Sequence, residues 1–471
     1  MSRLQISVLT TEDIERIHKA SVELLNDPGV DIGSPKIYNM LLENGAARGK
    51  GQQRVRIDES MVKKALSTCL YDYEIAFLNG KKKNIRNNRH YSTCLVDPKI
   101  NDCSGGNVPP VLKDCADAAR LLDAIETVTI PYKMDLRYTD VPDEYSVLQS
   151  NLALFENFTR HVMCGPINPQ DAQTWVDMAE IMAPGPLGQN PVITMIISPS
   201  SPLSFHNDVL EMLLVATRRN LPVICLPCPM CGLTSPVSIA GTLAMLNAEN
   251  LMLIVVTQML NPGNPMVYHT VAMPVDTRYM IPRLSAPEKM LMTIAASQIG
   301  HYYGIPSAAT ASSTDVSVFD IQNGAESMSQ IFPSILSEAD IITGIGSNSN
   351  ACGTSLSQIL CDLEFIRLAD RFAAGINLGA MDEALSSIRE VSPGGNFVNY
   401  EHTIDHLLSG EIFTQDILDW TPEPKSDVSP TKGGMLVNAR EKARNILNSH
   451  RPKTDELKLK ALRDYVTSHI Q

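Results

Sequence analysis

Eight short apolar segments recur along the middle of the chain, and each is followed by a longer stretch with the apolar spacing of a helix. They lie near residues 92, 128, 160, 192, 222, 265, 304 and 339 and read YSTCLVD, TVTIPYKMD, RHVMCGP, VITMIIS, PVICLP, PMVYHT, GIPSAAT and ADIITGI. Neighbouring segments are roughly 30 to 43 residues apart, which is the spacing of βα units. Eight such units predict an α/β fold, a TIM-type (β/α)8 barrel. An open doubly wound sheet is the alternative, but no G-x-G-x-x-G follows the first segment.

The pattern changes at both ends of this series and divides the chain into three parts. Residues 1–90 predict an N-terminal extension of helices and a hairpin, in which Ser34 and Asp58 are placed to cap helices and an Asn-Gly pair makes the hairpin turn. Residues 91–420 predict the barrel. Residues 421–471 contain the charged run LKLKALRDYVTSHI and predict a helical tail that wraps the barrel or makes an oligomer contact.

The amino-acid composition and net charge disfavour some classes of binding partner. The 471-residue chain is 44% hydrophobic and 19% charged, and its formal net charge is −13. Nucleic acid and anionic membranes repel an acidic surface, so we expect neither as a partner. The first 20 residues lack the apolar core of a signal peptide, and no uninterrupted apolar run is long enough to span a bilayer. We therefore expect a cytoplasmic protein whose ten cysteines are free thiols.

Loops that follow the strands of such a barrel share one face, and that face carries the chemistry. The stretch ATASSTDVSVFDIQNG follows the seventh segment and carries Thr314, Asp315, Phe319 and Gln322. We expect it to form part of the rim of an active site. Asp320 in the same stretch is placed to cap the next helix.

Three other strand ends also offer polar or aromatic groups. They are Arg137 and Tyr138 after the second segment, Tyr268 and His269 at the end of the sixth, and Asn348 and Asn350 on a glycine-flanked loop after the eighth. Each has a structural alternative: a surface ion pair for Arg137, a buried core histidine for His269, and an ordinary polar turn for the last loop.

Two carboxylates, Asp97 and Glu249, could likewise have either a functional or a structural role. Asp97 follows the first segment, where it either contacts a ligand or forms a turn. Glu249 lies in the apolar setting AMLNAENLMLIVV, which favours a buried structural carboxylate.

Cys225, Cys228 and Cys231 make two overlapping C-x-x-C spacings after the fifth segment. Zinc needs further His, Cys or carboxylate ligands at the same face, and one local cluster supplies at most three thiolates. Packing of small residues is the alternative, and we assign no metal site.

An ordered set of motifs between about residue 10 and Trp420 resembles the trimethylamine methyltransferase superfamily. The motifs are TSPVSIAGTLAMLNAENL, NPGNPMVYHT, SAPEKMLMTIAASQIGHYYGIPS, TDVSVFDIQNGAE, ADIITGIGS, SLSQILCDLEFI and VSPGGNFVNYEHT. The resemblance implies a TIM-type barrel that transfers a methyl group from an amine to a corrinoid, a cobalamin derivative. That corrinoid is carried by a separate small protein, so no tightly bound cofactor is expected.

Departures from the family pattern bear on the substrate. Members acting on trimethylamine carry pyrrolysine, whereas this chain contains only the twenty standard residues. The family frame Asp-x-Gln-x-Gly is present as Asp320, Gln322 and Gly324. The non-pyrrolysine branch is associated with glycine betaine, proline betaine and carnitine, so the resemblance implies a quaternary amine:corrinoid methyltransferase.

The chemistry of a quaternary amine suggests roles for the rim residues. Its leaving group is a neutral tertiary amine, so positioning rather than acid–base catalysis is expected. In this hypothesis Tyr138, Tyr268 and Phe319 surround the trimethylammonium group, and Arg137 or His269 with Asn348 holds the carboxylate. Thr314 and Asn350 are further candidate substrate contacts, and Asp315 and Gln322 are the candidates for a direct catalytic role.

Two other functions stay open on the sequence alone. One is a zinc-dependent methyltransferase that uses the three clustered cysteines, and the other is a non-catalytic betaine-binding protein. We also expect a homo-oligomer.

Overall fold

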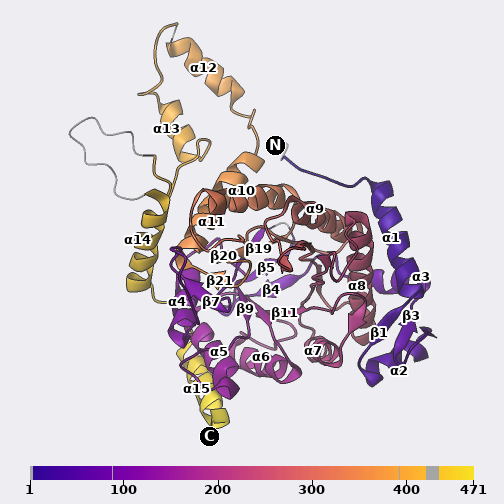
Figure 1. The fold of residues 1–471 in the computed structure, drawn as a ribbon. Coiled ribbons are helices and arrows are strands. Elements are labelled where there is room, and N and C mark those ends of the chain that lie inside the picture. The colour runs from indigo at the N-terminus through magenta and orange to yellow at the C-terminus, as the bar shows by residue number, and fades with distance from the viewer. Residues whose placement is uncertain (1–3, 87, 392, 421–433, 471) are drawn as a thin grey trace.

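Eight parallel strands form the centre of the protein (Figure 1). The computed structural model describes residues 4–86, 88–391, 393–420 and 434–470. The central strands are β6 (His90–Thr93), β9 (Tyr132–Met134), β10 (Val162–Gly165), β11 (Ile193–Ile197), β13 (Val223–Cys225), β15 (Met266–Tyr268), β18 (Ala308–Thr310) and β19 (Ile341–Ile345). Seven of the eight predicted apolar segments contain one of these strands in full, and the first overlaps β6, which begins one residue earlier at His90.

Strand pairing closes the eight strands into a ring. Strands β9, β10, β11, β13 and β15 pair in parallel in that order, and β6, β19 and β18 form a second parallel set. Parallel bridges join the two sets at both edges, between Tyr268 and Ser307 and between Cys94 and Tyr132. The predicted α/β fold is therefore confirmed, and its strand order is sequential around the ring.

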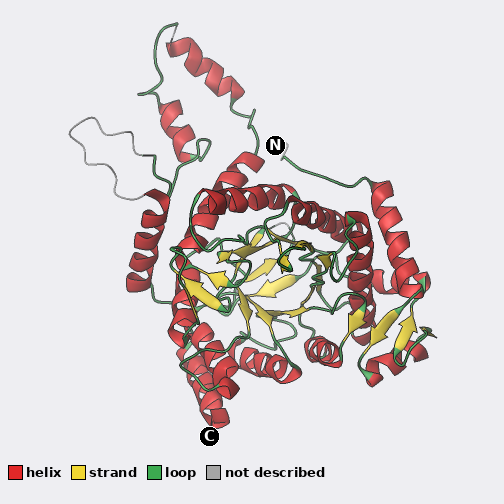
Figure 2. Ribbon diagram, in the orientation of Figure 1, coloured by secondary structure: helices red, strands yellow, loops and turns green. Residues whose placement is uncertain are grey.

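A helix follows each strand and lies outside the ring (Figure 2). In chain order these helices are α4 (Leu112–Asp123), α5 (Ser146–Asn157), α6 (Pro169–Met182), α7 (Asn207–Thr217), α8 (Ile239–Leu260), α9 (Pro287–Tyr302), α10 (Ile321–Leu336) and α11 (Leu356–Ala373). Asp320 begins α10 as predicted, because its side chain accepts hydrogen bonds from the backbone N–H groups of Gln322 and Asn323.

Helix α8 has the overall length and composition of a membrane span, although Asn247, Glu249 and Asn250 interrupt its apolar residues. Most of it is buried inside the protein, against α1 (Thr11–Asn26) and α3 (Glu59–Leu66). Glu249 on this helix accepts hydrogen bonds from Ser201 Oγ and Leu203 N, each at 2.8 Å. It is thus a buried structural carboxylate, as predicted, and α8 is a core helix.

The N-terminal segment packs beside the ring rather than within it. Besides α1 and α3 it contains β1 (Val30–Ile32), α2 (Pro35–Glu43), β2 (Ala47–Arg48) and β3 (Arg54–Arg56). Strand β1 pairs in parallel with β12 (Ser204–Phe205), which lies in the loop between β11 and α7. Asp58 caps α3 as predicted, whereas the hydroxyl of Ser34 makes no capping hydrogen bond to α2.

The predicted hairpin closes the amino-terminal end of the ring. It consists of β4 (Glu74–Ala76) and β5 (Lys82–Asn84), and Gly80 adopts a φ of 85° in its turn. Ile75 and Phe77 of this hairpin pack with inward-facing residues of the barrel strands. Within the described residues, the carboxyl-terminal end of the ring is therefore the end that can admit a ligand.

Several short strands lie at the carboxyl-terminal end of the ring. They are β7 (Lys99–Asn101), β8 (Asn107–Val108), β14 (Met230–Cys231), β16 (Met273–Asp276), β17 (Ile281–Pro282), β20 (Ser347–Asn348) and β21 (Gly353–Thr354). They lie in the loops that follow β6, β13, β15 and β19, so they build the rim above the strands.

In the part of the chain that the structure describes, four helices follow the barrel. Helices α12 (Met381–Val391) and α13 (Glu401–Leu408) extend away from the ring, whereas α14 (Gly434–Ser449) and α15 (Glu456–Ile470) lie against its outer helices (Figure 1). Helix α15 contains the predicted charged run and packs on α5 and α6. The first part of the predicted tail, residues 421–433, lies outside the described residues.

Candidate active site

A cavity of about 130 Å³ lies inside the ring at the carboxyl ends of the strands. Every strand contributes a residue, either within the strand or directly after it: Cys94, Tyr132, Met163, Ile196, Leu226, His269, Thr310 and Thr343. The following residues complete the lining: Val271, Leu284, Ser313, Gly344, Ser347 and Ala351. None of these is an acidic or basic side chain apart from the imidazole. Barrels of this kind carry their chemistry at this position.

Tyr132 on β9 supplies the phenol ring of the lining. Its ring lies against Gly165 at the end of the adjacent strand, where a Cβ atom would stand 2.7 Å from the phenol oxygen and 2.9 Å from a ring carbon. A side chain at residue 165 would therefore displace the ring. Burial raises the pKa of the Tyr132 phenol well above its ordinary value, so the ring is neutral.

His269, directly after β15, is an uncharged imidazole. Its Nδ1 lies 2.9 Å from the carbonyl oxygen of Ala308, and its Nε2 lies 3.4 Å from Thr310 Oγ1. Burial lowers the pKa of His269 to about 3. Near neutral pH Nδ1–H donates to the carbonyl and Nε2 is an acceptor. A neutral imidazole does not provide the cation that the hypothesis of a carboxylate clamp needs.

Asp97 does not line the cavity itself but contacts the lining residue Ser347. Its Oδ2 accepts hydrogen bonds from Ser347 Oγ at 2.9 Å and Thr354 Oγ1 at 2.8 Å. Burial raises the pKa of Asp97 to about 6. Because Ser347 lines the cavity, a carboxylate that is largely ionised at neutral pH stands close to an otherwise uncharged space.

The loop after β18 contributes to the lining through Thr310 and Ser313. The hydroxyl of its Thr314 is occupied by Asn323 Nδ2 at 3.2 Å and by the carbonyl of Val316 at 3.0 Å. Thr314 is therefore a structural link between the loop and α10 and does not line the cavity.

Asp315 and Gln322, the two candidates for a catalytic role, also lie outside the cavity lining. Asp315 accepts hydrogen bonds from Leu284 N at 3.0 Å and Ser285 Oγ at 2.6 Å. It thereby fixes the backbone of Leu284, which does line the cavity. Gln322 is exposed in the first turn of α10 and donates to Glu326.

The loop after β19 folds over the cavity in a left-handed turn. Ser349, Asn350 and Ala351 have φ values of 51°, 60° and 57°. This conformation is costly for residues other than glycine, and Ala351 lines the cavity. A hydrogen bond from Asn350 N to Thr314 O at 2.9 Å ties the turn to the neighbouring loop. Asn348 faces Asn101, whose Nδ2 donates to its Oδ1 at 2.7 Å.

A buried carboxylate on α11 organises both rim loops. Asp362 accepts hydrogen bonds from Ser312 Oγ at 2.7 Å, after β18, and from Gly346 N at 2.8 Å, after β19. Ser327 and Gln358 donate to its other oxygen. Four donors compensate for the cost of burying this group, so Asp362 fixes the two loops relative to each other.

The proposed aromatic cage is not assembled around this cavity. The hydroxyl of Tyr268 donates to Asn247 Oδ1 on α8 at 3.0 Å, so its ring points outward into the helix layer. Tyr138 is buried, and its backbone N–H donates to Ser146 at the start of α5. Phe319 packs against the apolar cluster between α11 and α14. Tyr132 occupies the position that the hypothesis gave to these rings.

The proposed carboxylate clamp is also not assembled. Arg137 is exposed and forms an ion pair with Asp143, which is the surface alternative. Asn348 is engaged by Asn101, and His269 is neutral. None of these groups offers a positive charge to the cavity.

The three clustered cysteines do not meet at a common point within the described part of the chain. Cys225 is buried on β13, and burial raises the pKa of its thiol. Cys228 Sγ donates to the carbonyl of Leu226, and Cys231 Sγ lies 3.5 Å from Thr242 Oγ1. Separate partners favour packing over a zinc site.

Tyr132, Cys94 and Thr343 line the cavity but were not among the residues predicted from the sequence. All three lie within segments that were predicted as strands, and their side chains face the inside of the ring. Side chains alternate between the two faces of a strand, so this alternation within the predicted strands could have identified the inward-facing residues. Of the site residues predicted from the sequence, His269 does line the cavity. Most of the others lie in the loops beyond the strands, and Tyr268 ends β15 but points outward.

Sequence comparison gives a single consistent result. A family model described as Trimethylamine methyltransferase (MTTB) matches residues 2–470. Trimethylamine methyltransferase MttB of Methanosarcina barkeri strain Fusaro is 25% identical over 466 residues, which cover 96% of this chain and 92% of that protein. Glycine betaine methyltransferase of Desulfitobacterium hafniense strain Y51 is 24% identical over 403 residues, 84% of each chain.

Among solved structures, the monomethylamine methyltransferase MtmB of Methanosarcina barkeri aligns with 93% of this chain and 93% of its own, at 14% identity and a TM-score of 0.49.

Proposed function

Because the chain belongs to the trimethylamine methyltransferase family of methyltransferases, we propose that it moves a methyl group from a quaternary amine to the Co(I) corrinoid of a separate corrinoid protein. Candidate substrates are betaines such as glycine betaine, proline betaine and carnitine. The observation that carries the proposal is the cavity itself, which is enclosed at one end, predominantly apolar and lined by a neutral tyrosine ring with a carboxylate behind it.

A trimethylammonium group suits this lining. Its charge is spread over methyl groups that make apolar contacts with Met163, Ile196 and Leu226. The face of the Tyr132 ring attracts a cation, and the Asp97 carboxylate adds a favourable field at short range. The described lining contains no lysine or arginine to oppose it.

The protonation states also suit a reaction without proton transfer. A quaternary ammonium releases a neutral tertiary amine when its methyl group leaves, so no group has to protonate the leaving nitrogen. His269 is neutral and engaged by the Ala308 carbonyl. Burial raises the pKa of the Cys94 thiol well above its ordinary value, so that sulfur is a poor competing nucleophile. Positioning is then the main catalytic contribution of this chain.

The corrinoid, when its carrier protein docks, supplies the nucleophile that takes the methyl group. The rim loops that carry Leu284, Ser313 and Ala351 reach the cavity from the carboxyl-terminal face. That face is the open end of the ring, because the β4–β5 hairpin closes the other. Asp362 and Asp315 hold these loops in place and thereby fix how closely an acceptor approaches the substrate methyl group.

The experiment combines the protein with a corrinoid protein reduced to Co(I) and follows the visible spectrum. Glycine betaine, proline betaine, carnitine, γ-butyrobetaine and trimethylamine are added singly. Methylation of the corrinoid with one quaternary amine and not with trimethylamine supports the proposal and names the substrate. Methylation with trimethylamine alone contradicts the choice of substrate class. Ligand binding without methylation, using a corrinoid protein shown to be competent, favours a betaine-binding protein.

A further inference from the structure

We propose that Glu383, His402 and His406 form a zinc site that joins helix α12 to helix α13. Both helices belong to the arm, residues 375–420, which extends away from the barrel (Figure 1). The site is separate from the cavity and from the proposed methyl transfer. It also departs from the expectation drawn from the sequence, in which no metal site was assigned.

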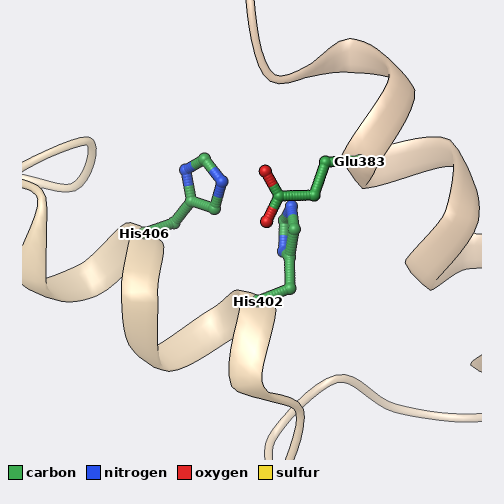
Figure 3. Close-up of side chains that lie close together, drawn as sticks. All are labelled: Glu383, His402 and His406. Carbon is green, nitrogen blue, oxygen red and sulfur yellow. The ribbon is translucent and has the colours of Figure 1, made fainter.

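The three side chains converge from two helices (Figure 3). His402 and His406 are one turn apart on α13, so their rings project from the same face. Their ring centroids are 4.3 Å apart, with an angle of 36° between the planes. Glu383 reaches them from α12, and the potential ligand atoms of the three residues all lie within 4.8 Å of one another.

These groups do not satisfy one another by ordinary hydrogen bonding. Among the described residues, no hydrogen bond or ion pair joins Glu383 to either imidazole. His402 Nε2 is buried and has no hydrogen-bond partner. A buried polar nitrogen without a partner is costly. A divalent cation bound to His402 Nε2 removes this penalty.

Two imidazoles and one carboxylate are a ligand set that zinc favours. Three protein ligands leave at least one position for water or another group. Small rotamer changes bring ligand atoms spaced as these are to zinc distances of about 2.0–2.2 Å. Calcium and magnesium prefer oxygen ligands, so a site with two nitrogens excludes them by its chemistry.

The arm gains stability from such a link because it buries little of its own surface. In the described residues of α12 and α13, Ser387 is the buried position. Leu385, Ile388, Leu407 and Leu408 are 40%, 54%, 52% and 82% exposed. Apolar burial is therefore too small to fix the helix pair. A metal ion that bridges them closes the intervening loop and restrains the arm in the folded protein.

The test uses full-length protein freed of metal by dialysis against a chelator. Zinc binding is measured by calorimetry, and Co2+ serves as a spectroscopic probe of tetrahedral coordination. We expect one tight zinc per chain, and at least a 100-fold loss of affinity in H402N/H406N and in E383Q. H469A, which removes an exposed histidine on α15, and C352S, which removes an exposed thiol, are matched controls that should keep the site.

Hydrogen exchange separates a structural link from incidental binding. Zinc should slow exchange of the backbone amides of α12 and α13 in the native protein and not in the H402N/H406N variant, while the barrel is unchanged in both. Equal zinc affinity in native protein and H402N/H406N, or zinc binding without slower exchange in the arm, would overturn the proposal. Neither readout depends on methyl transfer, so failure here leaves the proposed function untouched.

Discussion

A Cβ atom on Gly165 would stand 2.7 Å from the phenol oxygen of Tyr132. The absence of a side chain at the end of β10 thus makes room for the ring that β9 directs into the cavity. Residues on two adjacent barrel strands therefore set the position of the Tyr132 ring, and this relationship leads to the first two predictions.

Replacing Gly165 with alanine should displace the Tyr132 ring. Overpacking a buried site costs about 1–3 kcal/mol of unfolding free energy, and the displaced ring should raise KM for a quaternary amine. Thermal unfolding and steady-state kinetics of G165A measure the two effects. Unchanged KM with unchanged stability would show that the ring has room to move.

Removing the ring should weaken cation binding specifically. Tyr132→Ala should raise Kd for a trimethylammonium ligand by about 2- to 30-fold, the range that corresponds to a cation–π interaction of about 0.5–2 kcal/mol. Tyr132→Phe keeps the ring and should bind nearly as well. Calorimetry with the ligand and with its neutral tert-butyl analogue provides the control, because the difference in affinity between Y132F and Y132A should be larger for the cation than for the neutral analogue.

Neutralising Asp97 should weaken binding of the same cation without loss of fold. In D97N the hydroxyls of Ser347 and Thr354 keep a polar partner, but the negative charge behind the lining is gone. Binding of the neutral analogue should be unaffected. Equal cation affinity in D97N and native protein would remove Asp97 from the proposed mechanism.

The same carboxylate predicts a pH dependence. Burial raises the pKa of Asp97 to about 6, above the ordinary value of about 3.9. Native affinity for the cation should therefore fall as the pH drops through about 6, and D97N should lack this step. The effect on stability has the opposite sign. Between about pH 4 and 6 the folded protein keeps a proton on Asp97 that the unfolded chain releases. The free energy of unfolding therefore decreases as the pH rises through this range. D97N should then unfold no more readily than native protein at pH 8.

Gly344→Ala should be strongly destabilising. Gly344 has a φ of 84°, and a Cβ there would lie 2.2 Å from the carbonyl oxygen of Ser312. Backbone strain alone costs about 1–3 kcal/mol, and the clash adds to it. Gly324 is a matched control, because it lies within α10 and a Cβ there would meet no other atom within 4 Å. G324A should stabilise the protein by up to about 1 kcal/mol. Chemical denaturation of both variants measures the difference.

The succession of helices and strands follows from local patterns along the chain. Apolar segments alternate with helical patterns, and local chemistry sets several boundaries: Asp320 caps α10, Asp58 caps α3, and Gly80 allows the hairpin turn. These features depend on residues close together in the chain, where backbone sterics and short-range hydrogen bonds decide the outcome. The ordered motifs likewise identified the family without any tertiary information.

The tertiary structure decided which side chains meet. Tyr268 and Tyr132 are both aromatic residues on barrel strands, but the first bonds to α8 and the second lines the cavity. Asp97 acquires its raised pKa from burial beside Ser347 and Thr354, which lie more than 200 residues away in sequence. Glu383 meets His402 and His406 only because α12 folds back toward α13. The direction in which a side chain points, its burial and its contacts with distant residues depend on closure of the ring and on packing of all the elements together. Local sequence patterns therefore do not determine them.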